Sequence, residues 1–358
     1  MSCTFSGMVP SWQVAGWLLC ALAPSFNVSD VTPPVRSGSG LALLHPSTLT
    51  LMDINTSNGL AIIMTSSVSI IIPAFNAERY LEEAARSALR QSEPSDEIII
   101  VDDGSKDGTL SIAQDLASKH TQIQVMTQSN GGAAAARNAG LAKAKGEYLL
   151  FLDADDRLHE NAVHNHLMAF KDHPEAAMVF GAYDGIDENG VVRGSSQTPI
   201  EDVSLEDLAL RVVAIPSISM YKKTALIDIG GYDERFRQSQ DVDLNLRLVR
   251  IGKIFSHGMK VADYRRHRTQ VTNHRARTCQ AHIDVLENNF GKSSLSPDLK
   301  LLKRAKAKLH SRFGYMQYRV ALGALKRGHV SEARTATRLV LLRLKARFQG
   351  ENWQPKRS

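Results

Sequence analysis

Short apolar runs alternate with segments of helical spacing between Val68 and Leu152. A short apolar run bounded by turn residues is typical of a buried strand, and the segments between the runs are long enough for crossover helices. The pattern therefore predicts an α/β domain with a mostly parallel sheet and helices on both of its faces. The expected strands are Val68–Ile72, Glu97–Val101, Ile123–Thr127 and Tyr148–Leu152, and the expected helices are Glu78–Gln91, Gly108–Lys119 and Ala133–Lys145.

Polar side chains directly follow three of these strands. Pro73 and Asn76 follow the first strand, Asp102 and Asp103 end the second, and a carboxylate cluster follows the fourth. In open α/β sheets, ligands bind beyond the carboxyl ends of the strands. We therefore expect the three polar clusters to form one site at one edge of the sheet.

The cluster after the fourth strand, Asp153-Ala154-Asp155-Asp156, has three carboxylates within four residues. Like charges this close repel each other, which raises the pKa of at least one of them. A hard divalent cation such as Mg²⁺ or Mn²⁺ would explain the cluster, because these ions prefer carboxylate oxygen and often bind substrate phosphates. The alternative is a solvated acidic turn, since Asp is a common turn residue.

These clusters belong to a longer series of motifs. The motifs are Pro73-Ala74-Phe75-Asn76-Ala77-Glu78, Val101-Asp102-Asp103-Gly104-Ser105, Asn130-Gly131-Gly132 with Ala136-Arg137-Asn138-Ala139-Gly140, Gly146-Glu147-Tyr148 leading to Leu152-Asp153-Ala154-Asp155-Asp156, Gly230-Gly231-Tyr232-Asp233-Glu234-Arg235-Phe236, and Gln240-Asp241-Val242-Asp243-Leu244 with Arg247-Leu248. In this series the chain resembles a family 2 glycosyltransferase with the GT-A fold. The resemblance covers about residues 68–272 and implies an inverting enzyme that uses a nucleotide sugar.

The resemblance implies a nucleotide-sugar site. Phe75 and Pro73 would flank the base, since an aromatic face suits stacking. Asp103 would accept a hydrogen bond from a ring N–H of uracil, which favours UDP-sugars or dTDP-sugars over guanine nucleotides. Asn76 and Glu78 would hold the ribose side. The full implied set is Pro73, Phe75, Asn76, Glu78, Asp102, Asp103, Arg137 and Asp153.

Two residues of this set have other interpretations. Glu78 also suits a helix N-terminus, where an acidic side chain is favourable. Arg137 would lie near the diphosphate or pair with Asp102, and its alternative is a surface position on an alanine-rich helix.

The resemblance also implies a metal site for Mn²⁺ or Mg²⁺, with Asp155, Asp156 and His267 as ligands. Asp153 and Asp155 form the D-x-D pair, and in similar enzymes one carboxylate binds the ion while another reaches the ribose or sugar. His267 lies in Tyr264-Arg265-Arg266-His267, which is similar to the segment that closes the family's catalytic domain. A solvated loop histidine is the alternative for His267, and His257 is the other candidate.

An inverting transfer needs a carboxylate that takes the proton of the acceptor hydroxyl. The resemblance places this base at Asp241, which precedes an amphipathic helix over Leu244–Arg250. Family members often have Glu-Asp here, whereas this chain has Gln240 before Asp241. Asp243 is the competing candidate, expected to be an ordinary acidic residue at the start of the helix, and the alternative for Asp241 is a helix cap.

The sugar and acceptor pockets are less defined by the sequence. Pro216–Tyr221 falls where similar enzymes have a strand facing the donor sugar, and Gly230–Gln240 would form the acceptor-side loop. Tyr232 and Phe236 could stack on a sugar ring or anchor the loop in the core.

The 358-residue chain has three scattered cysteines and no C-x-x-C spacing, which indicates a reduced, cytosolic setting. It has no apolar run of about 20 residues, so we expect no membrane span. Residues 1–63 are rich in Ser, Thr, Gly and Pro and do not follow the pattern; we expect them to be disordered or a non-native extension, with Met64 as the natural start.

Residues 64–272 are expected to form the catalytic domain, and residues 273–358 a basic helical extension. Residues 260–358 contain 23 Lys and Arg against 6 Asp and Glu, a balance of +17, so residues 1–259 carry −11. This asymmetry suggests an anionic membrane surface as partner. The alternative is a helical hairpin packed on the catalytic domain, and no nucleic-acid motif is present. The expected helices are Leu301–Arg312, Tyr315–Lys326 and Val330–Phe348.

Taken together, the motifs predict a metal-dependent inverting glycosyltransferase that adds one sugar to a saccharide or lipid-linked saccharide, in surface-polysaccharide or glycolipid assembly. It would act in the cytoplasm or on the inner face of the cell membrane. The alternative is a degenerate nucleotide-sugar-binding protein. A dinucleotide-binding oxidoreductase is disfavoured because no G-x-G-x-x-G follows the first strand. A processive synthase is disfavoured because the chain lacks that group's Q-x-x-R-W motif.

Overall fold

The computed structural model describes residues 66–310, except residues 200, 212–213, 269 and 271–274, together with residues 334, 337 and 341. All of them belong to one compact unit, Thr65–Ser358. The other unit, Met1–Met64, which includes the expected extension 1–63, lies outside the described residues. So do the expected helix Tyr315–Lys326 and most of Val330–Phe348.

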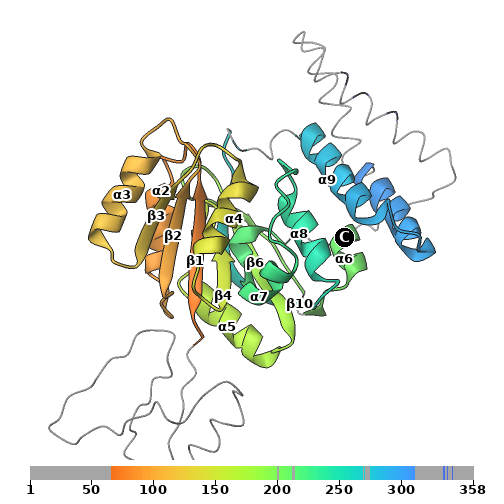
Figure 1. Cartoon of the computed structure of the whole chain (residues 1–358), viewed down its shortest axis with the longest axis horizontal. Coiled ribbons are helices and arrows are strands. Elements are labelled where there is room, and N and C mark those ends of the chain that lie inside the picture. The colour runs from red at the N-terminus through yellow and green to blue at the C-terminus, as the bar shows by residue number, and fades with distance from the viewer. Residues whose placement is uncertain are drawn as a thin grey trace, which may run out of the picture. The chain divides into compact units, whose positions relative to one another are not determined.

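A mixed sheet lies at the centre of the unit (Figure 1). Among the described residues its order is β3-β2-β1-β4-β9-β6-β10-β5, with β7 paired to β6 and β8 paired to β10. The strands are β1 (Val68–Ala74), β2 (Glu97–Asp102), β3 (Ile123–Thr127), β4 (Tyr148–Phe151), β5 (Arg157–Leu158), β6 (Ala176–Ile186), β7 (Val192–Ser195), β8 (Glu201–Asp202), β9 (Ser219–Lys222) and β10 (Lys253–Arg265).

The four strands that the apolar runs predict lie side by side as parallel neighbours, β3-β2-β1-β4. Beyond β4 the sheet becomes mixed, because β9 runs antiparallel to both β4 and β6, whereas β6 and β10 are parallel to each other. The expected α/β fold class, with a parallel central block, is therefore confirmed.

Helices pack around this sheet (Figure 1). They are α2 (Leu81–Leu89), α3 (Thr109–Lys119), α4 (Ala133–Lys143), α5 (Ala162–Asp172), α6 (Leu205–Leu210), α7 (Lys223–Asp228), α8 (Gln240–Leu248) and α9 (Arg275–Phe290), with a 3₁₀ turn, η2, at Pro216–Ile218. Residues 296–310 are also helical, in agreement with the helix expected from Leu301. Within the described part of the chain, no helix has the length and apolar character needed to cross a membrane.

The central strands are buried on both faces, which explains their continuous apolar sequence. Ile71 of β1 and Phe151 of β4 have no exposed surface. Helix α4 packs closely on β1 at Gly140, where a Cβ atom would lie 2.4 Å from Ile71 Cγ2. The glycine in the Ala139-Gly140 pair therefore allows α4, and the residues it carries, to approach the sheet.

Several element boundaries differ from the expectation by a few residues, among them the start of α2. Helix α2 begins at Leu81 rather than Glu78, because the N–H groups of Tyr80 and Leu81 both donate to the Ala77 carbonyl oxygen and form a turn. In the segment after residue 272, α9 packs against α8, which fits the alternative of an extension packed on the catalytic domain.

Candidate functional site

The loops that follow β1 and β2 are held together by side chains of the first loop. Asn76, with a left-handed φ of 50°, donates its N–H to Ser105 Oγ (3.0 Å) and accepts from the Lys106 N–H (2.8 Å) through Oδ1. Glu78 Oε2 accepts from the N–H of Gly108 (2.8 Å), which precedes α3. The first two polar clusters therefore meet at one edge of the sheet, as expected.

Both acidic residues at the end of β2 are buried, and Asp103 organises the start of α4. Its Oδ1 accepts from the Gly131 N–H (2.8 Å) and from Gln128 Nε2 (2.8 Å), and its Oδ2 accepts from the Gly132 N–H (2.7 Å). Gly132 has a φ of 92°, which favours glycine. Both carboxylate oxygens of Asp103 thus contact the chain itself, and its contact with uracil stays a prediction.

Phe75 differs from its neighbours because 48% of its surface is exposed. It follows β1 directly, whereas the preceding strand residues Ile70 to Ile72 are fully buried. A large aromatic side chain at the strand's carboxyl end therefore has a face open to a planar ligand.

Arg137 and Asp153 form an ion pair at the centre of the site. Arg137 Nη2 lies 2.6 Å from Asp153 Oδ1, and only 5% of the arginine is exposed. The predicted pairing of Arg137 with Asp102 and its surface alternative are therefore wrong, because α4 places this side chain inward, beside Asp153 and over the Tyr232 ring. Burial raises the pKa of Asp153, Arg137 opposes this shift, and Asp155 and Asp241 add to it.

The other two carboxylates of the cluster have different surroundings. Asp155 Oδ2 lies 2.9 Å from His267 Nε2. Asp156 is buried, with Oδ2 accepting from Ser217 Oγ (2.7 Å) and Oδ1 from the Arg265 N–H (2.9 Å). Burial raises the pKa of Asp156 well above its usual range, and Asp155 and Asp153 raise it further. The accessible pair is therefore Asp155 with His267, whereas direct metal binding by Asp156 stays a prediction.

Arg265 holds the loop that carries the carboxylate cluster, although the sequence pattern gave this arginine no role of its own. Its Nε donates to the Asp155 carbonyl oxygen (2.8 Å), and its Nη2 donates to Glu83 Oε2 (2.5 Å). The guanidinium also lies over the Tyr80 ring (4.7 Å to the centroid), which in turn faces the His267 ring at 5.3 Å. Because these partners are far apart in the sequence, no local pattern could have revealed them.

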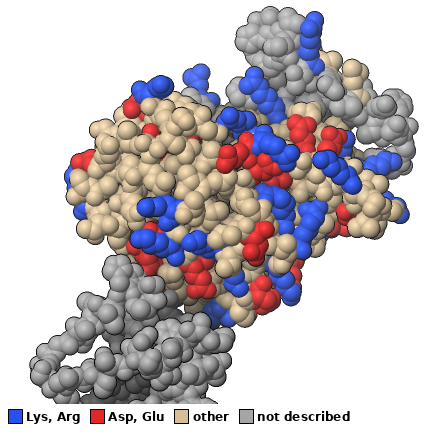
Figure 2. Space-filling view, in the orientation of Figure 1, with Lys and Arg blue, Asp and Glu red and all other residues tan. Residues whose placement is uncertain are grey.

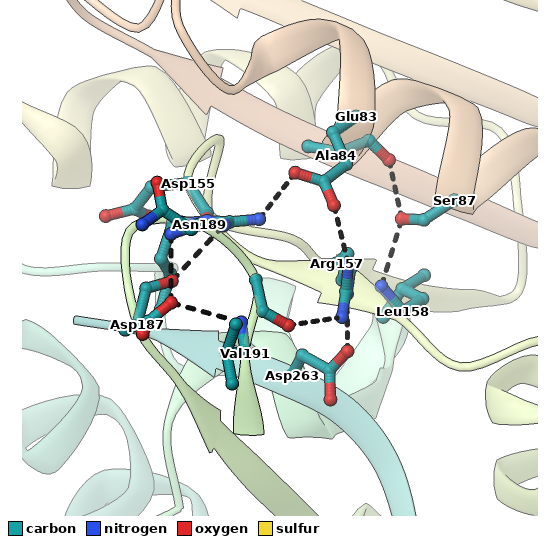
Figure 3. Close-up of polar contacts among 12 residues, drawn as sticks. Glu83, Ala84, Ser87, Asp155, Arg157, Leu158, Asp187, Asn189, Val191 and Asp263 are labelled. Carbon is teal, nitrogen blue, oxygen red and sulfur yellow. Dashed lines mark hydrogen bonds and ion pairs between the residues drawn. The ribbon is translucent and has the colours of Figure 1, made fainter. Parts of the chain in front are cut away.

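Glu83 continues this network toward a second group of titratable residues (Figure 3). Glu83 Oε1 accepts from Arg157 Nη1 (2.7 Å), and Arg157 Nε donates to Asp263 Oδ2 (2.5 Å). Asp263 also lies with His159 and Asp184 in a group whose ligand atoms are within 4.8 Å of one another. Lys260 Nζ is 2.7 Å from Asp184 Oδ1, so both carboxylates already have cationic partners and the group forms an ion-pair network.

Asp241 is the second residue of α8 and lies close to the central ion pair. Its charge contributes to the raised pKa of Asp153 and, after burial and Tyr221, to that of Tyr232. The residue before α8 is Ser239, whose side chain makes no capping hydrogen bond, and Asp241 stands within the first turn. The structure therefore brings Asp241 to the same sheet edge as Asp153.

Asp243 differs from the prediction of an ordinary acidic residue at a helix start. It has no exposed surface, and its Oδ2 lies 2.7 Å from Arg247 Nε. The remaining nitrogens of Arg247 donate to the carbonyl oxygens of Ile229 and Gly231, each at 2.8 Å. Asp243 is thus a buried structural acid.

Tyr232 anchors the acceptor-side loop in the core. It is 3% exposed and packs edge-on against Phe151 at 5.2 Å. The Asn138 side chain binds both backbone groups of Tyr232, accepting from its N–H (2.8 Å) and donating to its carbonyl oxygen (2.9 Å). Of the two interpretations of Tyr232, the core anchor fits this structure. Phe236 is partly buried against the same core.

Two further expectations are corrected by the geometry. Pro216–Tyr221 is not one strand, because Pro216–Ile218 forms the turn η2 and only then does β9 begin. The turn brings Ser217 to Asp156. His257, the alternative to His267, is buried and lies 3.0 Å from Nδ1 of His166 in α5, rather than beside Asp155.

Comparisons with known proteins identify the family of this chain. Residues 69–230 match the model of glycosyl transferase family 2. An uncharacterised glycosyltransferase of Rickettsia prowazekii is 31% identical over 248 residues, which cover 66% of this chain and 75% of the relative. A chondroitin synthase of Pasteurella multocida is 32% identical over 195 residues, 54% of this chain, and the match spans only 20% of the synthase.

Solved structures show the same fold. TarS of S. aureus in complex with UDP-GlcNAc has a TM-score of 0.52 at 19% identity, covering 80% of this chain and 93% of that one. The mannosyltransferase PcManGT from Pyrobaculum calidifontis, in complex with GDP-Man and Mn²⁺, has a TM-score of 0.57 at 19% identity and covers 80% and 89%. The family match and the Rickettsia relative together show that this chain belongs to glycosyl transferase family 2.

Proposed function

We propose that this chain is a metal-dependent, inverting glycosyltransferase that moves one sugar from a nucleoside diphosphate sugar, preferably a UDP-sugar, to a saccharide or lipid-linked saccharide. The observation that supports this most directly is the convergence of Asp153, Asp155, His267 and Asp241 at one sheet edge. Arg137 supplies a buried cation there, and Phe75 supplies an exposed aromatic face.

The donor set suits a divalent ion at the diphosphate. Asp155 and His267 offer a carboxylate oxygen and a ring nitrogen 2.9 Å apart, from two separate elements, and neither is buried beyond the reach of a ligand. Mn²⁺ or Mg²⁺ bound there would offset the charge that develops on the leaving diphosphate. Asp156, fixed by Ser217 and Arg265, would keep the loop in place beside that ion.

The chemistry assigned to the chain's own residues is a single displacement. Asp241 takes the proton of the acceptor hydroxyl while that oxygen attacks the anomeric carbon. The bond from this carbon to the diphosphate oxygen breaks, the electron pair leaves with the nucleoside diphosphate, and the anomeric configuration inverts. Arg137, held by Asp153, stabilises the negative charge near the departing group.

The nucleotide preference rests on Asp103 and Phe75, and similar structures bind both UDP-GlcNAc and GDP-Man. Calorimetric titration of the full chain with UDP, GDP and dTDP, each with and without Mn²⁺, tests the donor site. We expect UDP to bind and its affinity to increase with Mn²⁺. Metal-dependent binding of GDP alone would overturn the nucleotide assignment, and no binding of any nucleotide would favour the degenerate alternative.

We further propose that the basic C-terminal region approaches an anionic membrane surface and so meets a lipid-linked acceptor. In the described part the charge is mixed: Arg304 pairs with Glu206 and Lys306 with Glu287, and Figure 2 shows both signs interspersed over α8 and α9. The excess of Lys and Arg in the whole region supports the proposal. Salt-sensitive cosedimentation with phosphatidylglycerol vesicles, but not phosphatidylcholine vesicles, is the expected result; equal binding to both would contradict it.

A further inference from the structure

We propose that α9 is a positioning element for the catalytic base, and that Asn289 and His282 on this helix hold the first turn of α8 in place. The proposal rests on the proposed role of Asp241. Helix α9 lies beyond the matched family segment, residues 69–230, and beyond residue 272, where the catalytic domain was expected to end. The proposal therefore gives this helix a function in the site.

One face of α9 is buried from Cys279 to Phe290. The buried positions recur at helical spacing, so they form a single stripe. Phe290, at the end of this stripe, is part of the core, and the Arg250 guanidinium lies 5.0 Å from its ring centroid. Helix α9 is therefore a packed part of the catalytic domain. The stripe consists of Cys279, Ile283, Leu286 and Phe290, and Val285 beside it is buried as well.

The Asn289 side chain connects both ends of α8. Its Nδ2 donates to Asp243 Oδ1 (2.8 Å) and to the Val285 carbonyl oxygen (3.0 Å), and its Oδ1 accepts from Arg250 Nη1 (3.1 Å). Asp243 lies in the first turn of α8, and Arg250 lies just beyond the last. Seven residues correspond to about two helical turns, so both contacts fall on one face of α8.

The contact with Asp243 determines where Asp241 points. Both oxygens of the buried Asp243 are bound, Oδ2 by Arg247 and Oδ1 by Asn289. Two residues along an α-helix correspond to a rotation of about 200°, so Asp241 projects from the face opposite to Asp243. Because the packed face is fixed by α9, the opposite face presents Asp241 to the sheet edge that carries Asp153.

A second contact fixes the backbone that enters α8. Ser239 has a φ of 60°, the left-handed region that non-glycine residues rarely adopt, and its Oγ lies 2.7 Å from His282 Nδ1. The same ring nitrogen is 3.2 Å from the Thr278 carbonyl oxygen, which orients the imidazole within α9. His282 therefore holds the strained residue that immediately precedes the helix of the base.

The test compares Asn289→Ala with its neighbour variant Asn288→Ala in the full chain. Asn288 accepts a long hydrogen bond (3.4 Å) from the exposed Arg235 rather than binding α8, so its variant is the matched control. We expect Asn289→Ala to lower kcat on the order of tenfold to a hundredfold, as small misplacements of catalytic groups do. The donor KM and the affinity for UDP with Mn²⁺ should stay unchanged, and Asn288→Ala should behave like the wild type.

Amide hydrogen exchange provides a readout that needs no turnover. Asn289→Ala should speed exchange in the first turns of α8, and His282→Ala, which leaves no buried charge unpaired, should do the same if the first variant folds poorly. Unchanged exchange in both variants would overturn the positioning role, as would an equal loss of kcat and UDP affinity. If the wild-type protein has no transfer activity, the proposed function is wrong. The hydrogen-exchange result alone would then test whether α9 holds the first turn of α8.

Discussion

His267 Nε2 lies 2.9 Å from Asp155 Oδ2, although 112 residues separate them in the chain. The contact joins the end of the sheet's parallel block to the segment that follows β10. Arg265 supports both residues of this pair. It donates to the Asp155 carbonyl oxygen, and its guanidinium lies over the ring of Tyr80, which faces the His267 ring. The pair is therefore held at a fixed separation by the fold, which a metal site requires.

Replacing Asp155 by Asn should weaken metal-dependent nucleotide binding. The substitution keeps the shape of the side chain but removes the charge that attracts the ion, so UDP affinity with Mn²⁺ should fall by about tenfold or more. Titration calorimetry at several Mn²⁺ concentrations measures this change. Asp184→Asn, in the ion-pair network with His159 and Asp263, is the control and should leave the Mn²⁺ dependence intact. If Asp184→Asn weakens Mn²⁺-dependent UDP binding and Asp155→Asn does not, the metal site lies in that network instead.

Asp241→Asn should abolish transfer while sparing donor binding. Loss of a general base typically lowers the rate roughly 10²–10⁴-fold, and the amide cannot accept the hydroxyl proton. Single-turnover transfer from a UDP-sugar, together with UDP titration, separates the two effects. Asp228→Asn, at the exposed end of α7, serves as the control. A transfer rate close to that of the wild type in Asp241→Asn would mean that another group is the base.

The contrast between Asp241 and Asp243 shows what the sequence could and could not predict. Both acids stand in the first turn of one amphipathic helix, and the resemblance favoured Asp241 as the base. One partner of Asp243, Arg247, lies four residues along the helix, but the other, Asn289, is 46 residues away, so no local pattern indicated that both oxygens of Asp243 are bound. The same holds for Asp156, whose partner Ser217 is 61 residues away.

The strands of the sheet also differ in how far the sequence predicts them. Strands β1, β2 and β4 were predictable because nearly all of their residues are buried and each reads as a mostly apolar run between turns. β10 was not, because its sequence Lys253–Arg265 mixes charged and apolar residues and its long pairing with β6 is interrupted by register shifts. Pairing between strands that are distant in the sequence produces no clear pattern of apolar and polar residues within either strand.

Arg265→Lys should destabilise the protein despite keeping the charge. Arg265 is 2% exposed and uses three directions of its guanidinium, toward Asp155, Glu83 and the carbonyl oxygens of residues 187 and 188. A lysine ammonium cannot reproduce this fork, so we expect a loss of about 3 kcal/mol in the free energy of unfolding. Denaturant titration measures it.

Arg193→Lys is the matched control for that substitution. Arg193 also pairs with a carboxylate, Asp187, but its side chain is 66% exposed, and exposed ion pairs contribute at most about 1 kcal/mol. Equal effects of the two lysine variants would show that Arg265 does not anchor the loop of Asp155.

The buried histidines His166 and His257 should make stability depend on pH between about pH 4 and 6.5. Burial lowers the pKa of His257 to about 4 and that of His166 well below its usual range, with His257 adding to the shift of His166. Both side chains are therefore neutral in the folded state, whereas the unfolded chain binds protons below about pH 6.5. Because the unfolded state binds more protons in this window, the free energy of unfolding should fall as the pH is lowered through it.

Denaturant titrations at a series of pH values measure this dependence. Each histidine can contribute a slope of up to about 1.4 kcal/mol per pH unit, so His257→Gln should flatten the curve between pH 6.5 and 4. His164→Gln, which replaces an exposed histidine of the same helix α5 that pairs with Glu93, should leave the slope as it is in the wild type. An unchanged slope in His257→Gln would mean that other groups, such as the ion-paired carboxylates, dominate acid unfolding.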